Sequence, residues 1–272
     1  MQTYKEVVIE EIEPRQMELL IALLTMAGFE GFEEKENSLK AYIAEADFNE
    51  EELQQLAQQH HFTTAVYDQH ERNWNVVWES NFPPVQVDNF VAVRADFHPS
   101  IKNVTHEIII TPKMSFGTGH HATTYMMIEK MKTIDFSNKS VFDFGTGTGI
   151  LAILAEKLGA TKIYAVDNDD WSIENAKENI QKNNCVRIIV DKRSDALSAQ
   201  KFDVIFANIN KNVLLENMHA LAHQLSDNGI LIMSGLLKED EKDILESARQ
   251  QNLVHTSIDH KLQWIALVFR RD

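Results

Sequence analysis

The chain has 272 residues, of which 44% are hydrophobic, so it is long enough for one large domain or two ordinary ones. It has no apolar run of about 18 residues and no signal-peptide pattern, and its single cysteine, Cys185, cannot form an internal disulfide. We therefore expect a cytoplasmic protein without a membrane span. A net charge of −15 disfavours direct recognition of nucleic acid, because an acidic surface repels phosphates.

The first 67 residues alternate between strand-like and helical patterns. Strand character covers 4–11, 29–36, 38–46 and 62–68, and helical character covers 14–28 and 49–61. Pro14 suits a first helical turn, Gly28 suits a C-terminal cap, and Asn49 suits an N-cap that precedes glutamates. The order β-α-β-β-α-β predicts a small α+β domain of the ferredoxin-like type over residues 1–67.

This predicted N-terminal domain is acidic and carries no cluster of catalytic groups. Residues 1–60 hold 14 Asp and Glu against 4 Lys and Arg. Such a surface attracts basic partners, although ordinary solubilising surface explains the acids as well. We interpret the domain as a recognition module.

A connecting segment follows the N-terminal domain. Residues 68–90 contain Trp74, Trp78 and the pair Pro83-Pro84, and adjacent prolines break regular structure and stiffen a connection. Packing of the tryptophans against a domain is favoured over contact with a substrate. We therefore predict a linker over 68–90 and a second domain over 91–272.

The second domain alternates strands with helices from residue 139 onward, which is typical of a parallel, doubly wound sheet. Strand patterns cover 140–145, 162–167, 186–191, 202–209 and 229–235, and helical patterns cover 150–159, 171–183, 212–225 and 239–251. The last two strand patterns, 253–261 and 264–271, predict an antiparallel hairpin at the sheet edge, because about two residues cannot make a parallel crossover. The prediction is an α/β, Rossmann-like domain of seven strands that binds ligands at the carboxyl ends of its strands.

A glycine loop, DFGTGTG, follows the first strand of this sheet. Its spacing is G-x-G-x-G, and Ile150 stands where a nicotinamide-dinucleotide loop has its third glycine. A Gly-Lys-Ser/Thr ending is absent as well, which disfavours a phosphate-binding P-loop. Asp143 precedes Gly145 and Gly147, and its carboxylate would repel pyrophosphate and suit a cationic ligand. The loop therefore favours S-adenosylmethionine, with a tight turn that binds no ligand as the alternative.

Two further acids follow later strands. Asp167 ends the second strand, 22 residues after Gly145, where a carboxylate can accept hydrogen bonds from both ribose hydroxyls of an adenosine. Asp195 lies where an adenine amino group could be met, although a solvated loop position explains it equally well. Because NAD and S-adenosylmethionine share the ribose contact, Asp167 alone does not choose between them.

The fourth strand ends in ANIN, residues 207–210. Enzymes that methylate amines commonly have Asn or Asp here, and its side-chain oxygen accepts a hydrogen bond from the target amine. Methylases of nucleobases continue with Pro-Pro-Tyr, whose ring stacks on the base, whereas this chain continues with Ile209. Asn208 therefore indicates an aliphatic amine as the target, with a simple cap of the next helix as the alternative.

A second FGTG occurs earlier, in SFGTGHHATT (residues 115–124). His120 and His121 point in different directions on any regular element, and no HExxH motif or cysteine partner lies near them, so we expect no metal site. An internal repeat is disfavoured because the flanking residues do not match.

These motifs together resemble a known family. The runs SFGTGHHATT, FDFGTGTGILAILAEKLGA, AVDND, ANIN and MSGLL match, in order and spacing, the bacterial methyltransferases that modify ribosomal protein L11 of the large subunit, the PrmA family. The resemblance covers the linker and the C-terminal domain, while the N-terminal domain matches in element order and position. It implies that both FGTG loops serve one S-adenosylmethionine pocket and that the N-terminal domain holds the ribosomal protein.

The resemblance also implies which residues contact the cofactor. Asp143 and Gly147 are added to these because the glycine loop itself predicts them. The residues expected to bind S-adenosylmethionine are Thr124, Gly145, Asp167, Asn208, Gly147, Asp143, Phe116 and Gly117.

We predict an enzyme, a protein N-methyltransferase that moves methyl groups from S-adenosylmethionine to lysine side chains, the N-terminal amine, or both, of ribosomal protein L11. The product of the cofactor is S-adenosylhomocysteine. Asn208 would orient the amine, and His120, His121 or solvent would take its proton. The alternative is methylation of another protein or of a small-molecule amine, which has little need for an acidic docking domain. A cofactor-binding protein without activity is disfavoured, because Thr124, Asp143, Asp167 and Asn208 are all present.

Overall fold

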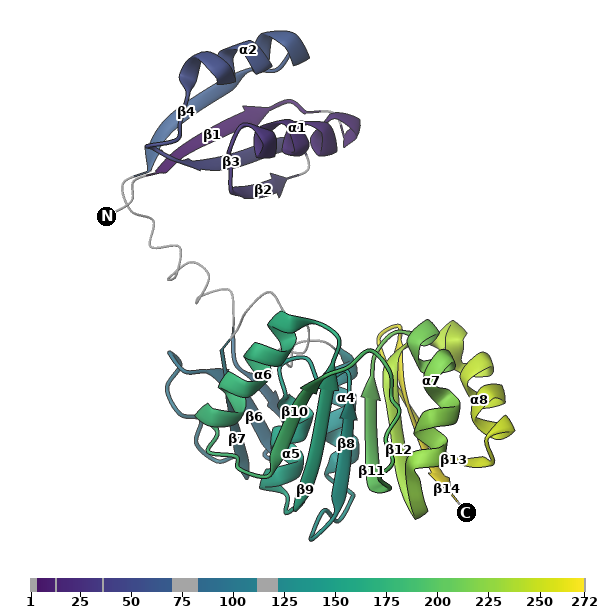
Figure 1. Ribbon diagram of the computed structural model, residues 1–272. Coiled ribbons are helices and arrows are strands. Elements are labelled where there is room, and N and C mark those ends of the chain that lie inside the picture. The colour runs from purple at the N-terminus through teal and green to yellow at the C-terminus, as the bar shows by residue number, and fades with distance from the viewer. Residues whose placement is uncertain (1–3, 13, 36, 70–82, 112–121, 272) are drawn as a thin grey trace. The chain divides into compact units, whose positions relative to one another are not determined.

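The structure is a computed structural model in which residues 4–12, 14–35, 37–69, 83–111 and 122–271 are described (Figure 1). The chain divides into two compact units, Met1–Asn81 and Phe82–Asp272, and each has a hydrophobic core of its own. None of the helices in these described ranges is long and apolar enough to cross a membrane.

The N-terminal unit is a four-stranded antiparallel sheet with two helices. Its elements are β1 (Tyr4–Glu10), α1 (Pro14–Met26), β2 (Gly31–Lys35), β3 (Ser38–Ala44), α2 (Glu50–His60) and β4 (Thr64–Gln69). The strands lie side by side in the order β2-β3-β1-β4. Asn49 caps α2 by accepting a hydrogen bond from the Glu52 N–H at 3.2 Å. The predicted order of elements and the predicted cap are confirmed.

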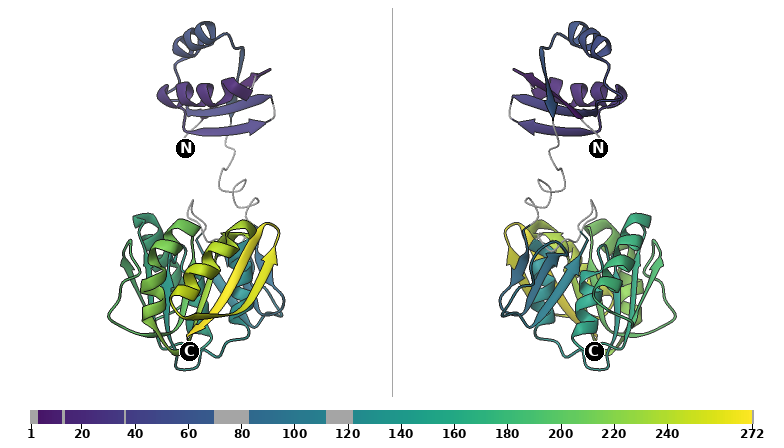
Figure 2. Two further views of the ribbon diagram at one scale, coloured as in Figure 1. Left: turned by 90° about the vertical axis from the view of Figure 1, so that its right-hand side faces the viewer. Right: turned by 90° about the vertical axis from the view of Figure 1, so that its left-hand side faces the viewer.

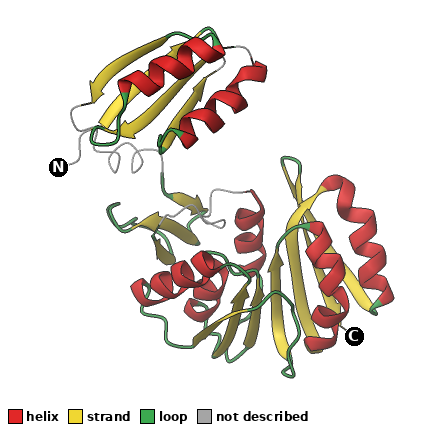
Figure 3. Cartoon of the chain, turned by 45° about the horizontal axis from the view of Figure 1, so that its top comes forward, coloured by secondary structure: helices red, strands yellow, loops and turns green. Residues whose placement is uncertain are grey.

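One face of this sheet carries the core of the unit. Val7 and Ile9 alternate along β1 toward that face, and both are completely buried. They belong to one cluster with Leu20 and Leu24 of α1 and Leu53 of α2. The two helices therefore cover the same face, as Figure 3 shows.

The C-terminal unit is built on a seven-stranded sheet. Its strands are β8 (Ser140–Phe144), β9 (Lys162–Asp167), β10 (Ile188–Lys192), β11 (Phe202–Asn208), β12 (Leu225–Leu237), β13 (Leu253–Lys261) and β14 (Trp264–Arg271). They lie in the order β10-β9-β8-β11-β12-β14-β13. The first five strands in that order are parallel, so the carboxyl ends of β9, β8 and β11 meet at one edge of the sheet.

The last two strands form the predicted antiparallel hairpin. Lys261 of β13 pairs with Trp264 of β14, and β14 also pairs with β12 in antiparallel sense. The hairpin therefore ends the sheet with β13 at the edge, which the left-hand view of Figure 2 shows in yellow.

Helices cover both faces of this sheet. Those of this unit are α4 (Ala122–Met131), α5 (Ile150–Lys157), α6 (Asp170–Lys182), α7 (Lys211–Gln224) and α8 (Glu241–Gln250), with a short 3-10 turn, η1 (Lys238–Asp240), before α8. Neighbouring residues of β8 face opposite layers: Val141 packs in a cluster with α4 and α5, and Phe142 packs in a cluster with α7 and α8. The predicted α/β fold with a mostly parallel, doubly wound sheet is confirmed.

A three-stranded sheet before α4 was not predicted. It consists of β5 (Val85–Val87), β6 (Val91–Ala95) and β7 (His106–Ile110), with β6 between the other two, and it faces the viewer in blue in the right-hand view of Figure 2. The predicted linker over 68–90 thus overlaps the end of β4 and the whole of β5, and its residues 70–82 lie outside the described residues.

An ion pair that is mostly buried stabilises this small sheet. Arg94 Nη2 of β6 donates to Glu107 Oε2 of β7 at 2.9 Å. Glu107 Oε1 also accepts from Ser100 Oγ at 3.0 Å and from the Ile101 N–H at 2.7 Å. The hydrogen bond from Arg94, helped by the other two and opposed by burial, lowers the pKa of Glu107 to about 2.

Candidate active site

Three of the predicted site residues stand at the carboxyl ends of adjacent strands. Asp143 is the second-last residue of β8, Asp167 is the last residue of β9, and Asn208 is the last residue of β11. Because β8 lies between β9 and β11, its glycine loop emerges between the other two side chains. The residues are 24 and more positions apart in sequence, and the parallel sheet brings them to one edge.

The glycine loop after β8 uses left-handed backbone at each of its glycines. Gly145, Gly147 and Gly149 have φ of +79°, +55° and +81°, a region that costs little for glycine alone. The loop is held against β9: the Gly145 N–H donates to the Val166 carbonyl at 2.9 Å, and the Gly147 N–H donates to Asp167 Oδ2 at 2.9 Å. Glycine is therefore favoured at these three positions by the left-handed backbone conformation of the loop.

Gly145 also has a protein neighbour that the sequence did not suggest. A Cβ at this position would lie 2.2 Å from Cγ2 of Ile209. A Cβ at Gly235 of β12 would likewise lie 2.3 Å from the Ile209 carbonyl oxygen. Ile209 follows Asn208 directly, so the residue next to Asn208 lies against Gly145 with its side chain and against Gly235 with its backbone.

Asp143 is a buried carboxylate beside the loop. It is 1% exposed, and its Oδ2 accepts a hydrogen bond from Thr146 Oγ1 at 2.6 Å. Its Oδ1 is buried without a hydrogen-bond partner among the described residues. Burial raises the pKa of Asp143 to about 7; the Thr146 hydroxyl and, more weakly, the Ala152 backbone N–H oppose this shift, and the charge of Asp167 assists it.

Asp167 is turned toward backbone N–H groups. Its Oδ2 accepts from Gly147 at 2.9 Å, and its Oδ1 accepts from the Asp169 N–H at 3.1 Å. A carboxylate has about four lone-pair sites, so each oxygen keeps the capacity to accept a second hydrogen bond from a ligand hydroxyl.

Asn208 meets a residue of the helix that follows the first FGTG motif. Its Nδ2 lies 3.4 Å from Oγ1 of Thr124, a long hydrogen bond that joins positions 84 residues apart. Thr124 is 3% exposed in the first turn of α4. The next helix is capped by Asn210, whose Oδ1 accepts from the Val213 N–H at 3.2 Å. The alternative interpretation of Asn208 as that cap is therefore wrong.

Comparison with known proteins decides the family. The chain matches the family model described as "Ribosomal protein L11 methyltransferase (PrmA)" over residues 5–272. A ribosomal protein L11 methyltransferase of Porphyromonas gingivalis is 39% identical over 263 residues, which cover 94% of this chain and 91% of the relative. The chain belongs to the ribosomal protein L11 methyltransferase family. It is thus an enzyme that transfers methyl groups from S-adenosylmethionine.

Solved structures agree with this family and fold. A ribosomal protein L11 methylase from Lactobacillus delbrueckii subsp. bulgaricus superposes with a TM-score of 0.64 at 30% identity, covering 70% of this chain and 99% of that one. A methyltransferase from Pyrococcus furiosus superposes with a TM-score of 0.52 at 20% identity over 60% of this chain and 89% of that one, a likeness of fold alone.

The residues present fit the methyl donor of the family. S-adenosylmethionine carries a sulfonium charge, and a buried carboxylate oxygen without a partner, Oδ1 of Asp143, is the group that a cation would satisfy. The glycine loop follows Asp143 closely in the chain, and Asp167 can accept hydrogen bonds from the ribose hydroxyls of the cofactor.

The remaining predicted residues are either outside the described ranges or bonded within their own loop. Phe116, Gly117 and His120 lie outside the described residues. Asp195, considered for an adenine contact, accepts at Oδ1 from Arg193 Nη2 at 2.8 Å and from the Leu197 N–H at 3.0 Å. Within the described ranges, no group of three or more His, Cys, Asp or Glu side chains is placed to hold a metal ion.

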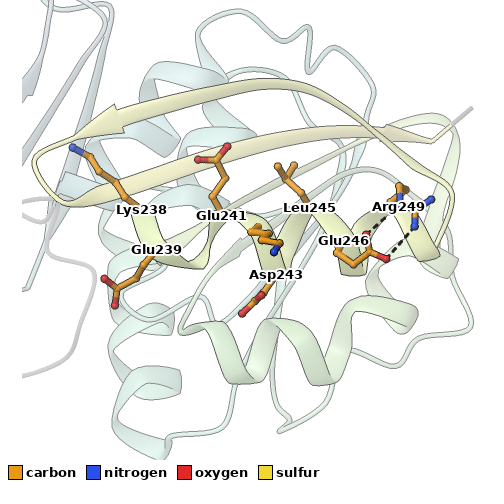
Figure 4. A pocket seen from close by; sticks show the side chains of 8 residues that line it. Lys238, Glu239, Glu241, Asp243, Leu245, Glu246 and Arg249 are labelled. Carbon is orange, nitrogen blue, oxygen red and sulfur yellow. Dashed lines mark hydrogen bonds and ion pairs between the residues drawn. The ribbon is translucent and has the colours of Figure 1, made fainter.

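A surface hollow along η1 and α8 is lined by a different set of residues. It mixes lysines, acids and Arg249, which pairs with Glu246 at 3.0 Å (Figure 4). None of the predicted site residues that the structure describes lines it. Alternating charges of this kind are typical of a solvated helix face.

Proposed function

We propose that this enzyme methylates amino groups of ribosomal protein L11, either lysine side chains, the N-terminal amine, or both. The observation that carries the proposal is the meeting of Asn208 and Thr124 beside the glycine loop, within a chain of this family. The names of the relatives supply the protein target, and the amide at the end of β11 suits an amine.

The cofactor-binding residues that we propose lie around the carboxyl ends of β8, β9 and β11. They are Thr124, Asp143, Gly145, Gly147, Asp167 and Asn208, with Phe116 and Gly117 proposed from the sequence alone. S-adenosylmethionine supplies an electrophilic methyl group, and no metal is proposed for the reaction. The chain's own part is to hold the donor and exclude water from the edge of the sheet.

Asn208 is proposed to orient the acceptor amine. Its Nδ2 is directed to the Thr124 hydroxyl, which leaves Oδ1 to accept, and no group of the described residues donates to that oxygen. An amine N–H bonded to Oδ1 would have its lone pair turned away from Asn208. Because a free lysine ammonium has a pKa of about 10.4, the amine must first lose a proton, and a site that excludes water lowers that pKa. His120 or solvent is proposed as the proton acceptor.

The N-terminal unit is proposed to be a ferredoxin-like domain that recognises the ribosomal protein. Its strand order, β2-β3-β1-β4, supports that fold, and its excess of acids suits a basic partner. The proposed division is a recognition domain over 1–67, a linker over 68–90 and a methyltransferase domain over 91–272. Because L11 is a ribosomal protein, we propose that the enzyme acts in the cytoplasm, either on free L11 or on L11 in the ribosome.

Mass spectrometry of purified ribosomal protein L11 tests the proposal. After incubation with this enzyme and S-adenosylmethionine, we expect mass gains in steps of one methylene on lysines or on the N-terminal amine. Omission of the enzyme is the control for chemical methylation. If L11 gains no mass while the enzyme binds the cofactor, the target is wrong and the N-terminal unit becomes the bait for finding another protein.

A further inference from the structure

Helix α6 carries a row of buried asparagines on one face. Asn175 and Asn179 are completely buried and Asn183 is 8% exposed, and their spacing of four places them above one another. A buried amide is unfavourable unless its polar atoms are hydrogen-bonded, and leucine would fill such a face without that requirement. The row therefore indicates that these amides hold other parts of the chain in place.

Asn183 bonds to one segment outside its helix, and its Nδ2 also donates to the Asn179 carbonyl at 2.8 Å. Its Oδ1 accepts from the Ile109 N–H at 3.0 Å, and its Nδ2 donates to the Ile109 carbonyl at 2.6 Å. The side chain thus pairs with β7 as a neighbouring strand would. It has no hydrogen bond to the glycine loop in the described structure.

Asn179, one turn earlier, joins two segments. Its Oδ1 accepts from the Thr111 N–H at 2.7 Å, just beyond the end of β7. Its Nδ2 donates to the Thr148 carbonyl of the glycine loop at 2.8 Å and to Asn175 Oδ1 at 3.1 Å. Every polar atom of the Asn179 amide group is therefore used, and one side chain connects β7 to the loop after β8.

The bond to Thr148 holds the carbonyl end of a peptide in the glycine loop. Thr148 stands between Gly147 and Gly149, which tolerate both signs of φ. The carbonyl of this peptide is held by Asn179, and its N–H, from Gly149, donates to the Thr146 carbonyl at 2.9 Å. Both ends of one peptide plane are therefore tied, and the loop keeps a single conformation between its second and third glycines.

We propose that Asn179 is a positioning residue for the cofactor: it presets the glycine loop in its binding conformation through the Thr148 carbonyl and aligns that loop with the chain leaving β7. The inference rests on the proposed cofactor site at the glycine loop. Asn179 acts through the loop and touches no reacting atom. Without its donor, the Thr148–Gly149 peptide samples other orientations, and the cofactor binds to a smaller fraction of molecules.

Three variants of the full-length chain separate this role from plain stability. Asn179→Ala removes all three side-chain hydrogen bonds, and Asn179→Asp keeps an acceptor for the Thr111 N–H while it offers the Thr148 carbonyl no donor. Asn183→Ala is the matched control, because it removes a buried amide of the same row that bonds to β7 and to the Asn179 carbonyl of its own helix but not to the glycine loop. Both alanine variants are expected to lower the Tm, since each leaves buried backbone groups unpaired.

Isothermal titration with S-adenosylhomocysteine is the decisive measurement. We expect the Kd of both Asn179 variants to rise by about tenfold, which corresponds to about 1.4 kcal/mol, and that of Asn183→Ala to stay within about twofold. Hydrogen exchange of the 145–149 segment should be faster in Asn179→Asp and unchanged in Asn183→Ala. If Asn179→Ala does not fold, Asn179→Asp carries the test.

Two results would overturn the proposal. Equal rises of Kd in Asn179→Ala and Asn183→Ala would mean that the row acts through stability alone. Wild-type affinity in Asn179→Asp would mean that the bond to Thr148 is irrelevant to binding. Failure of the unmodified enzyme to bind S-adenosylhomocysteine is a different outcome, because it would remove the proposed cofactor site itself.

Discussion

Gly235 offers the sharpest test of how the site is held together. It lies in β12 with φ of +83°, where the ladder between β12 and β14 shifts register between Met233 and Leu236. A Cβ here would lie 2.3 Å from the Ile209 carbonyl oxygen, 2.7 Å from the carbonyl carbon and 2.9 Å from the nitrogen. All three are backbone atoms, so no side chain can rotate away from the added methyl.

The expected cost of Gly235→Ala follows from these distances. A carbon and an oxygen in contact lie about 3.3 Å apart, so either β12 or the backbone of Ile209 must move by about 1 Å. The left-handed backbone adds about 1–2 kcal/mol for a residue with a Cβ, and overpacking adds about 1–3 kcal/mol. Asn208 directly precedes Ile209, and a displacement of about 1 Å in a catalytic group lowers turnover by about 100-fold.

The assay is kcat for methylation of L11, measured together with the free energy of unfolding in urea. Gly159→Ala is the matched control, because Gly159 also has a left-handed φ, +109°, while its added Cβ would meet nothing closer than 3.4 Å. We expect the control to lose stability and to keep kcat. A Gly235→Ala enzyme with kcat within about threefold of the wild type would refute the idea that β12 positions Asn208.

Three further predictions concern single side chains. Asn208→Ala should lower the kcat of L11 methylation by about 100-fold. Asn210→Ala removes a helix cap instead, so it should lower the free energy of unfolding in urea by about 1 kcal/mol and leave kcat unchanged. Because the folded pKa of Asp143 is raised from 3.8 to about 7, its contribution to stability is complete below about pH 4 and lost as the pH rises through 7. Urea unfolding measured from pH 4 to pH 8 should therefore show a free energy of unfolding that falls with pH, and Asp143→Asn should remove this fall. Glu107→Gln should destabilise the enzyme by about 3 kcal/mol, because Arg94 loses its ion partner, while kcat of the folded enzyme stays unchanged.

Much of the fold follows from local patterns in the sequence. The two residues between 261 and 264 force an antiparallel hairpin, and the structure has it with Lys261 opposite Trp264. Asn49 ahead of three glutamates marks a helix start that the structure confirms with a direct hydrogen bond. The carboxyl ends of β8, β9 and β11 could be placed together because a parallel sheet leaves no other arrangement for consecutive strand–helix units.

The parts that escaped prediction depend on contacts between distant segments. Strands β5 to β7 are three to five residues long, and β6 is buried at every position, so it shows no alternation. The role of Asn179 rests on partners 31 and 68 residues away. A signal was present nonetheless: asparagines at 175, 179 and 183 recur on a helix face where apolar residues are expected.

The contacts of Ile209 with two glycines have a consequence for how this chain can vary. Gly145 meets a side-chain methyl of Ile209 and also has a left-handed φ, so a smaller residue at 209 would remove the steric clash at 145 and leave the backbone cost of any residue with a Cβ. Gly235 meets the backbone of Ile209, which every residue at 209 retains. Position 235 should therefore stay glycine whatever occupies 209, whereas at position 145 residue 209 sets only one of the two obstacles to a larger side chain.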